Sequence, residues 1–176
     1  MSEQAGRYQR SFGGMVGAMV VLVAVVLAWV GFRALTTSPP ENPVQTVDYR
    51  ADVPAAKRAA DFDLVAPPTL PDGWRATTVT FTDEPEQHWH LGVLTDAGRY
   101  VGLEQGRQSA GSMVHRYVDE RAQRGTPVRV GSTSWATWTD PGGDTALVRR
   151  DGGTTTLVVG HDVPRSDLVS YTSSLR

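Results

Sequence analysis

The residues best suited to chemistry are two histidines and a group of carboxylates just before them. His88 and His90 are two positions apart in a segment that alternates like a β-strand, so both imidazoles project from one face. Asp83, Glu84 and Glu86 precede them in a turn. Imidazole and carboxylate groups bind zinc and copper, and the same groups could serve an enzyme. Two histidines make only half a metal site, so the pattern favours a solvated strand face, and we predict no metal ligand and no cofactor.

Four tryptophans form the second group of candidates. Trp74 follows a proline-rich run, and Trp89 lies on the apolar side of its strand. Trp135 and Trp138 are three apart in one strand, which places them on opposite faces. One of these two therefore lies either beneath a loop or exposed on a ligand groove or partner surface. The candidate ligand or partner surface consists of Trp74, His88, His90 and Trp138.

Other catalytic signatures are incomplete, and no catalytic residue is predicted. The string from Gly106 to Gly111 around Ser109 is one residue too long for the Gly-x-Ser-x-Gly nucleophile turn. The glycine pairs at 142–143 and 152–153 lack the lysine and the helix of a phosphate-binding loop. These strings are typical of a polar helix start and of turns between strands. The chain is therefore interpreted as a protein without enzymatic activity, with an enzyme as the alternative.

Composition excludes further classes of function. The chain has no cysteine, which rules out disulfides, thiolate metal sites and cysteine catalysis. Residues 36–176 carry 14 basic and 18 acidic side chains. This mildly acidic balance lacks the basic footprint of a nucleic-acid-binding domain, so no nucleic-acid partner is expected.

An uncharged apolar run occupies residues 11–32. As a helix it would extend for about 33 Å, enough to cross a bilayer core of about 30 Å. The run exceeds the 7–15 residues typical of a signal peptide and lacks a clear cleavage site, so the sequence predicts a retained transmembrane helix at 12–35. Arg7 and Arg10 precede it and Arg33 alone follows, which predicts a cytoplasmic N-terminus.

The predicted organisation follows from this segment. A Gly13-x-x-x-Gly17 pattern within it permits close helix packing and hence a homodimer. Three prolines after it indicate a stiff spacer. The domains expected at the cell membrane are a cytoplasmic tail at 1–11, a transmembrane helix in the lipid bilayer at 12–35, a proline-rich linker at 36–47 and an extracytoplasmic domain at 48–176.

The exterior part is predicted to be an α+β domain with about six mainly antiparallel strands, a mid-chain helix and a C-terminal helix. Period-two alternation indicates strands, and spacing of three and four indicates helices. Glycine-containing turns at 96–98 and 151–153 predict hairpins. The expected strands lie at 76–81, 88–95, 99–105, 127–130, 134–138, 145–150 and 154–160, with an edge strand at 47–50 and helices at 55–61, 112–125 and 164–175.

Two segments carry a family resemblance. The Ala-Pro-Pro-x-Leu-Pro-x-Gly-Trp run from Ala66 to Trp74 and the later run at 131–143 resemble actinobacterial single-pass membrane proteins of unknown function. The resemblance implies a membrane-anchored extracytoplasmic domain and brings no catalytic residues. The order of elements is also loosely similar to the Mog1/PsbP-like fold.

Together these features predict a membrane-anchored domain that binds an envelope protein, a lipid or a glycan without catalysis. One alternative is an envelope-acting enzyme or metal-binding domain that uses His88 and His90. The other alternative is a structural subunit of a membrane complex.

Overall fold

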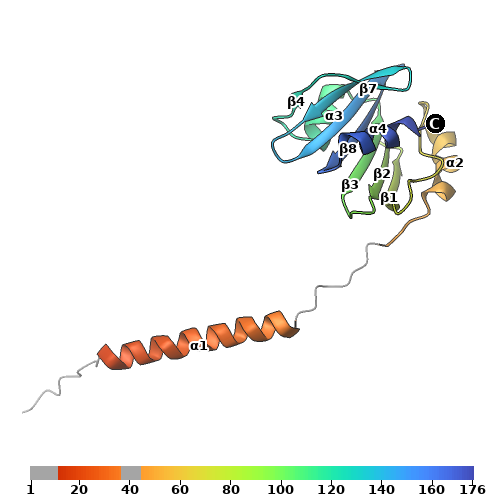
Figure 1. The fold of residues 1–176 in the computed structure, drawn as a ribbon. Helices are drawn as coiled ribbons and strands as arrows, with labels where there is room; N and C mark the ends of the chain where they lie inside the picture. Colours follow the sequence, from red (N-terminus) through yellow and green to blue (C-terminus); the bar gives the residue numbers. More distant parts are fainter. Residues whose placement is uncertain (1–11, 37–44) are drawn as a thin grey trace, which may run out of the picture. The chain divides into compact units, whose positions relative to one another are not determined.

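The computed structural model describes residues 12–36 and 45–176. The chain divides into two compact units, Met1–Pro43 and Val44–Arg176. The tail predicted at 1–11 and most of the linker predicted at 36–47 lie outside the described residues. Figure 1 shows the helix of the first unit and the sheet and helices of the second.

The first unit contains helix α1 (Phe12–Thr36). Within the described parts of the chain, no helix is long and apolar enough to cross a membrane. A crossing needs about 20 consecutive apolar residues. The transmembrane helix predicted at 12–35 is corrected accordingly, and the helix contact at Gly13 lies outside the described side chains.

The second unit is built on an antiparallel sheet of eight strands, where the sequence predicted about six. The strand order is β1-β2-β3-β8-β7-β6-β4, and β5 pairs with β6. The α+β character is confirmed, because helices pack against this sheet. The strands are β1 (Arg75–Thr82), β2 (His88–Leu94), β3 (Tyr100–Gly106), β4 (Gln123–Arg124), β5 (Val128–Val130), β6 (Thr133–Thr139), β7 (Asp144–Asp151) and β8 (Thr154–His161).

The hairpins form where the glycine turns predict them. Gly98 joins β2 to β3 with φ 73°, and Gly152 and Gly153 join β7 to β8 with φ 55° and 87°. Only glycine adopts these positive φ values without a steric penalty. The Gly152-Gly153 pair suits a two-residue turn with φ above zero at both positions, and Asp151 pairs with Thr154 across it.

Two local predictions are wrong because tertiary packing overrides propensity. The edge strand predicted at 47–50 runs instead into helix α2 (Tyr49–Ala59), whose Tyr49 is buried in the core. The helix predicted at 112–125 is the shorter α3 (Ala110–Tyr117), capped by the hydroxyl of Ser109. Beyond α3 the chain returns to the sheet as β4, where Gln123 and Arg124 pair with β6.

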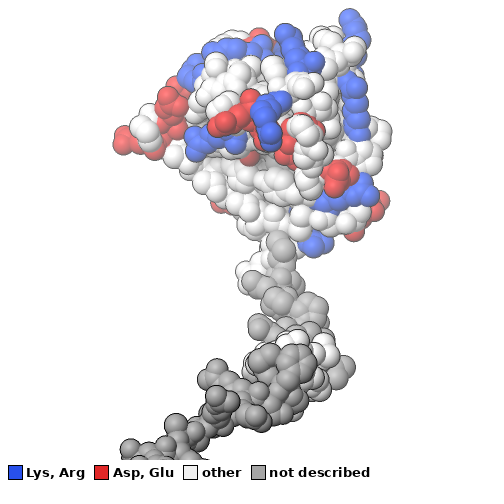
Figure 2. Space-filling view, turned by 90° about the vertical axis from the view of Figure 1, so that its left-hand side faces the viewer, with Lys and Arg blue, Asp and Glu red and all other residues white. Residues whose placement is uncertain are grey.

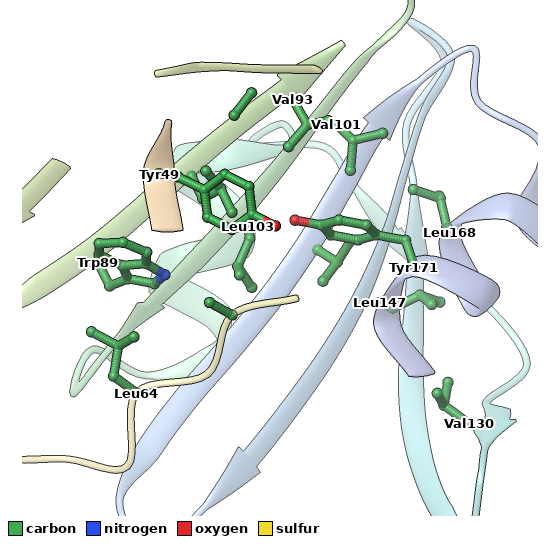
Figure 3. Close-up of a cluster of buried hydrophobic side chains, with 14 of the residues drawn as sticks. Tyr49, Leu64, Trp89, Val93, Val101, Leu103, Val130, Leu147, Leu168 and Tyr171 are labelled. Carbon is green, nitrogen blue, oxygen red and sulfur yellow. The ribbon is translucent and has the colours of Figure 1, made fainter. Parts of the chain in front are cut away.

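Side chains alternate between the two faces of the sheet and form two hydrophobic clusters. We call the side covered by α4 (Arg165–Ser173) the α4 face and the opposite side the α3 face. Figure 3 shows Tyr171 and Leu168 of α4 in one hydrophobic cluster with Trp89, Val93, Val101 and Leu103 from the strands and with Tyr49 and Leu64. On the α3 face, Met113 and Val114 of α3 pack against Leu157 and Val159 of β8.

Candidate functional site

The structure brings only part of the predicted surface together. His88 and His90 lie side by side on the α3 face, as the alternation predicts. Trp138 packs, half-buried, against the α3 cluster, while Trp135 is buried on the α4 face, so the two tryptophans do point to opposite sides. Trp74 is half-buried and stacks on Tyr171, with ring centroids 5.7 Å apart.

The two histidines share one buried carboxylate. Glu104 of β3 is 2% exposed and lies opposite His90 in the ladder. Its Oε1 is 2.7 Å from Nδ1 of His90, and its Oε2 is 3.0 Å from Nε2 of His88. Glu104 was not singled out in the sequence. Its period-two position beside buried Leu103 was the signal available, but the register with β2 depends on the tertiary fold.

The charge of Glu104 is maintained by its neighbours. Burial alone would raise the pKa of this carboxyl, but hydrogen bonds and charge from His88 and His90 outweigh burial and lower the pKa. Burial, aided by the Glu104 charge, raises the pKa of Tyr100 to about 12. The same two causes raise the pKa of Tyr117. The cluster therefore holds an ionised carboxylate between neutral phenols.

The geometry at His88 argues against a catalytic relay. Tyr117 Oη lies 3.1 Å from Nε2 of His88, the same nitrogen that faces Glu104. In a relay, the carboxylate and the reacting hydroxyl contact different ring nitrogens, so that a proton can cross the imidazole. One nitrogen cannot donate its single proton fully to both oxygens, which agrees with the poor hydrogen-bond geometry at Glu104 Oε2.

The acidic turn does not complete a metal centre with these histidines. Asp83 accepts a hydrogen bond from Gln87, and Glu86 accepts one from Gln108. Over residues 12–36 and 45–176, no group of three or more histidine, cysteine or acidic side chains is arranged to hold a metal ion. Within this part of the chain, the imidazoles of His88 and His90 face the Glu104 carboxylate, and the acidic turn bonds to Gln87 and Gln108 instead.

A cleft of about 600 Å³ lies on the α4 face. Its size is within the usual range of small-ligand sites. Strands β3, β6, β7 and β8 provide its floor, and the chain at 61–65 and the end of α4 contribute to its sides. The polar lining residues are Asp61, Asp63, Gln105, Arg107, Thr133, Arg149, Asp151, Thr154, Thr156, Thr172 and Ser173, and the apolar ones include Phe62, Val130, Trp135 and Leu175.

Gln105 of β3 and Arg107, just beyond the end of β3, hold the segment 61–65 beside the cleft. Gln105 donates from Nε2 to the carbonyl of Asp63 and accepts from the amide of Val65, both at 2.9 Å. Arg107 donates from Nε to the carboxylate of Asp61 at 3.0 Å. Because buried Gln105 satisfies backbone groups that no strand pairs with, the segment is held as an extended border of the cleft.

The cleft carries charges of both signs. Arg107 pairs with Asp61 and Arg149 pairs with Asp151, while Asp63 adds a further carboxylate. On the face that Figure 2 shows, acidic and basic side chains likewise alternate without a large patch of one sign. None of the cleft residues belongs to the surface predicted from the sequence. Gln105 and Thr156 were the available signals, as polar residues at core-facing strand positions.

The sequence comparisons agree with a domain whose role is not established. No curated protein matches the chain. A family model described as a protein of unknown function (DUF4245) matches residues 7–174. Since this match covers nearly the whole sequence, the chain belongs to the DUF4245 family.

Proposed function

We propose that the domain of residues 45–176 is a non-enzymatic binding module whose cleft on the α4 face accepts a glycan. The cleft itself is the observation that supports this proposal, because it is concave, of ligand size and lined mainly by hydrogen-bonding side chains. Five hydroxyl-bearing side chains line it, from Thr133, Thr154, Thr156, Thr172 and Ser173.

The lining favours a glycan over the other two ligand classes expected from the sequence. A lipid tail would place its apolar surface against paired charges at Arg107 and Arg149, which costs desolvation without compensation. An envelope protein would need a broader surface than a cleft of about 600 Å³. A glycan offers many hydroxyl donors and acceptors, and these match a lining that mixes carboxylates, guanidinium groups, an amide and hydroxyls.

We include in this proposal the resemblance to actinobacterial proteins and the looser resemblance to the Mog1/PsbP-like fold. Its support is the run from Ala66 to Trp74, which serves a structural purpose in the domain. Ala66 exchanges two backbone hydrogen bonds with Arg176, at 3.1 and 3.2 Å, and Trp74 stacks on Tyr171 of α4. The run thereby fastens the C-terminal helix whose end borders the cleft.

Calorimetric titration of the full chain with short soluble oligosaccharides tests the proposal. The probes are oligomers of N-acetylglucosamine, of glucose and of mannose, each of two to six units. Thr156→Val removes one hydroxyl from the cleft floor with little change of shape, and we expect binding about 3- to 10-fold weaker, the equivalent of one hydrogen bond.

Thr78→Val is the matched control, since Thr78 is an exposed strand residue of β1 that does not line the cleft. It should leave affinity unchanged. Absence of heat with every oligosaccharide at millimolar concentration would refute glycan binding, and equal weakening by both variants would place the binding site elsewhere.

A further inference from the structure

Over positions 78–82 the outer edge of β1 has no partner strand within the described sheet, and it has the character of an interaction surface. β1 is the first strand in the sheet order and pairs with β2 on one side only. On its other side, the amide of Val47 donates to the carbonyl of Ala76 at 2.9 Å. Among the described residues, no other backbone group outside the β2 ladder bonds to β1, so the outward-facing donors and acceptors at 78–82 have no partner within this part of the chain.

This edge lacks the features by which proteins usually protect strand edges. Charged side chains, proline and bulges discourage edge-to-edge pairing. The irregularity of β1 lies between Ala76 and Thr78, and the register from Thr78 to Thr82 is unbroken. The segment 78–82 reads Thr-Val-Thr-Phe-Thr, with neither charge nor proline and with side chains that all favour strands.

We propose that the β1 edge pairs with the β1 edge of a second copy of this chain, antiparallel and centred on Thr80. Such a two-fold contact needs a surface that is complementary to itself. In this register Thr80 faces Thr80, Thr78 faces Thr82, and Val79 faces Phe81. Threonine pairs and pairs of β-branched with aromatic residues are favourable cross-strand neighbours.

The charges that flank the segment fit the same antiparallel orientation. Arg75 begins β1, and the turn after it carries Asp83, Glu84 and Glu86. Antiparallel pairing about Thr80 brings the Arg75 end of one copy towards the acidic turn of the second. Opposite charges therefore meet at both ends of the paired segment, whereas a parallel arrangement would bring like charges together.

A groove beside the edge is the surface that the second copy would cover. It has a volume of about 350 Å³ and lies between α2 and β1. Its apolar lining comes from Ala55, Ala56 and Ala59 of α2, from Val79 and Phe81 of β1 and from Trp89. Because Val79 and Phe81 of the second copy emerge on the same face of the extended sheet, they can pack along this groove and remove apolar surface from water.

A single-cysteine variant tests the register directly. The chain has no cysteine, so Thr80→Cys introduces the sole thiol. In the full chain under mild oxidation, we expect a disulfide-linked dimer, since the Cα atoms of directly opposed antiparallel residues lie about 4.5–5.5 Å apart, a separation that a disulfide spans. Thr139→Cys, an exposed position on β6, is the matched control and should remain monomeric.

Variants with a charge at position 80 provide a second test, in which self-association is measured by sedimentation velocity. Thr80→Glu and Thr80→Lys each place two like charges opposite one another, and each should weaken self-association of the full chain at least tenfold. An equimolar mixture of the Thr80→Glu and Thr80→Lys variants should form a mixed dimer, because opposite charges then face one another. The proposal is overturned if the wild-type chain is monomeric at 100 µM, if Thr80→Glu associates as the wild type does, or if the control crosslinks as readily as Thr80→Cys.

Discussion

The two faces of the sheet use polar side chains in opposite ways. On the α3 face, Glu104 is buried and its oxygens are directed to His88 and His90, so the polar groups bond to one another. On the α4 face, Gln105 bonds to backbone groups, and hydroxyls such as Thr156 line an open cleft. Glu104 and Gln105 are neighbours in β3, and the difference teaches that residue type alone does not identify a ligand site. What matters is which polar groups the fold has already paired.

The largest effect is expected from Glu104→Ala. It removes the acceptor of both imidazoles, and hydrogen bonds to a charged group contribute about 1.5–3 kcal/mol each. Because the histidines are partly solvated, we expect a loss of about 3 kcal/mol in the free energy of unfolding, measured by urea denaturation. His115→Ala, an exposed histidine of α3, is the control and should cost less than about 0.5 kcal/mol. Equal effects would mean that the cluster is not a closed structural unit.

A smaller loss, about 2 kcal/mol, is expected from Gln105→Ala. The change leaves two backbone groups of the segment 61–65 without their hydrogen-bond partner. Leaving a buried polar group unsatisfied costs about 1–3 kcal/mol of stability. Unlike Glu104→Ala, it should also increase hydrogen exchange at Val65 and weaken any ligand of the cleft. If Glu104→Ala changed hydrogen exchange at Val65 and ligand binding as much as Gln105→Ala does, the two faces of the sheet would not be independent.

Acid should destabilise the domain through Glu104. The folded-state pKa of this carboxyl lies below its unfolded value of about 4.3. The ionised carboxylate therefore contributes stability above that pH, and the contribution is lost as the pH falls from about 4.3 through the folded pKa. Urea denaturation at pH 7 and pH 3 should show a smaller loss for Glu104→Gln than for the wild type. An identical pH dependence in both proteins would contradict this role.

The smallest effect is expected at His161, which is exposed at the end of β8. A hydrogen bond to Asp144, followed by the charge of Asp162, raises the pKa of this imidazole. Its contribution is present below the unfolded value of about 6.5 and is lost as the pH rises through the folded pKa. Asp144→Asn should lower the pKa of His161 in a proton NMR titration, while the Glu104 cluster stays unchanged.

Some of the candidate site could be predicted because it depends on local periodicity. The shared face of His88 and His90 and the opposite faces of Trp135 and Trp138 follow from the period of two in a strand. The pairing of Glu104 with the histidines could not be predicted, because it depends on the register between β2 and β3. The cleft depends on contacts between segments about 40 residues apart, as between Val65 and Gln105, which no local pattern encodes.

The sequence by itself determined the α+β class, the hairpins at Gly98 and at Gly152-Gly153, and the faces on which the strand residues lie. These follow from backbone sterics and from alternation, which act over a few residues. Only the tertiary structure decided that α3 ends at Tyr117 and that Gln123 and Arg124 join β6, because burial and ladder pairing outweigh helix propensity there. The tertiary structure likewise decided that Glu104 pairs with His88 and His90 while the cleft beside Gln105 stays open. Both facts depend on which distant groups each polar atom contacts.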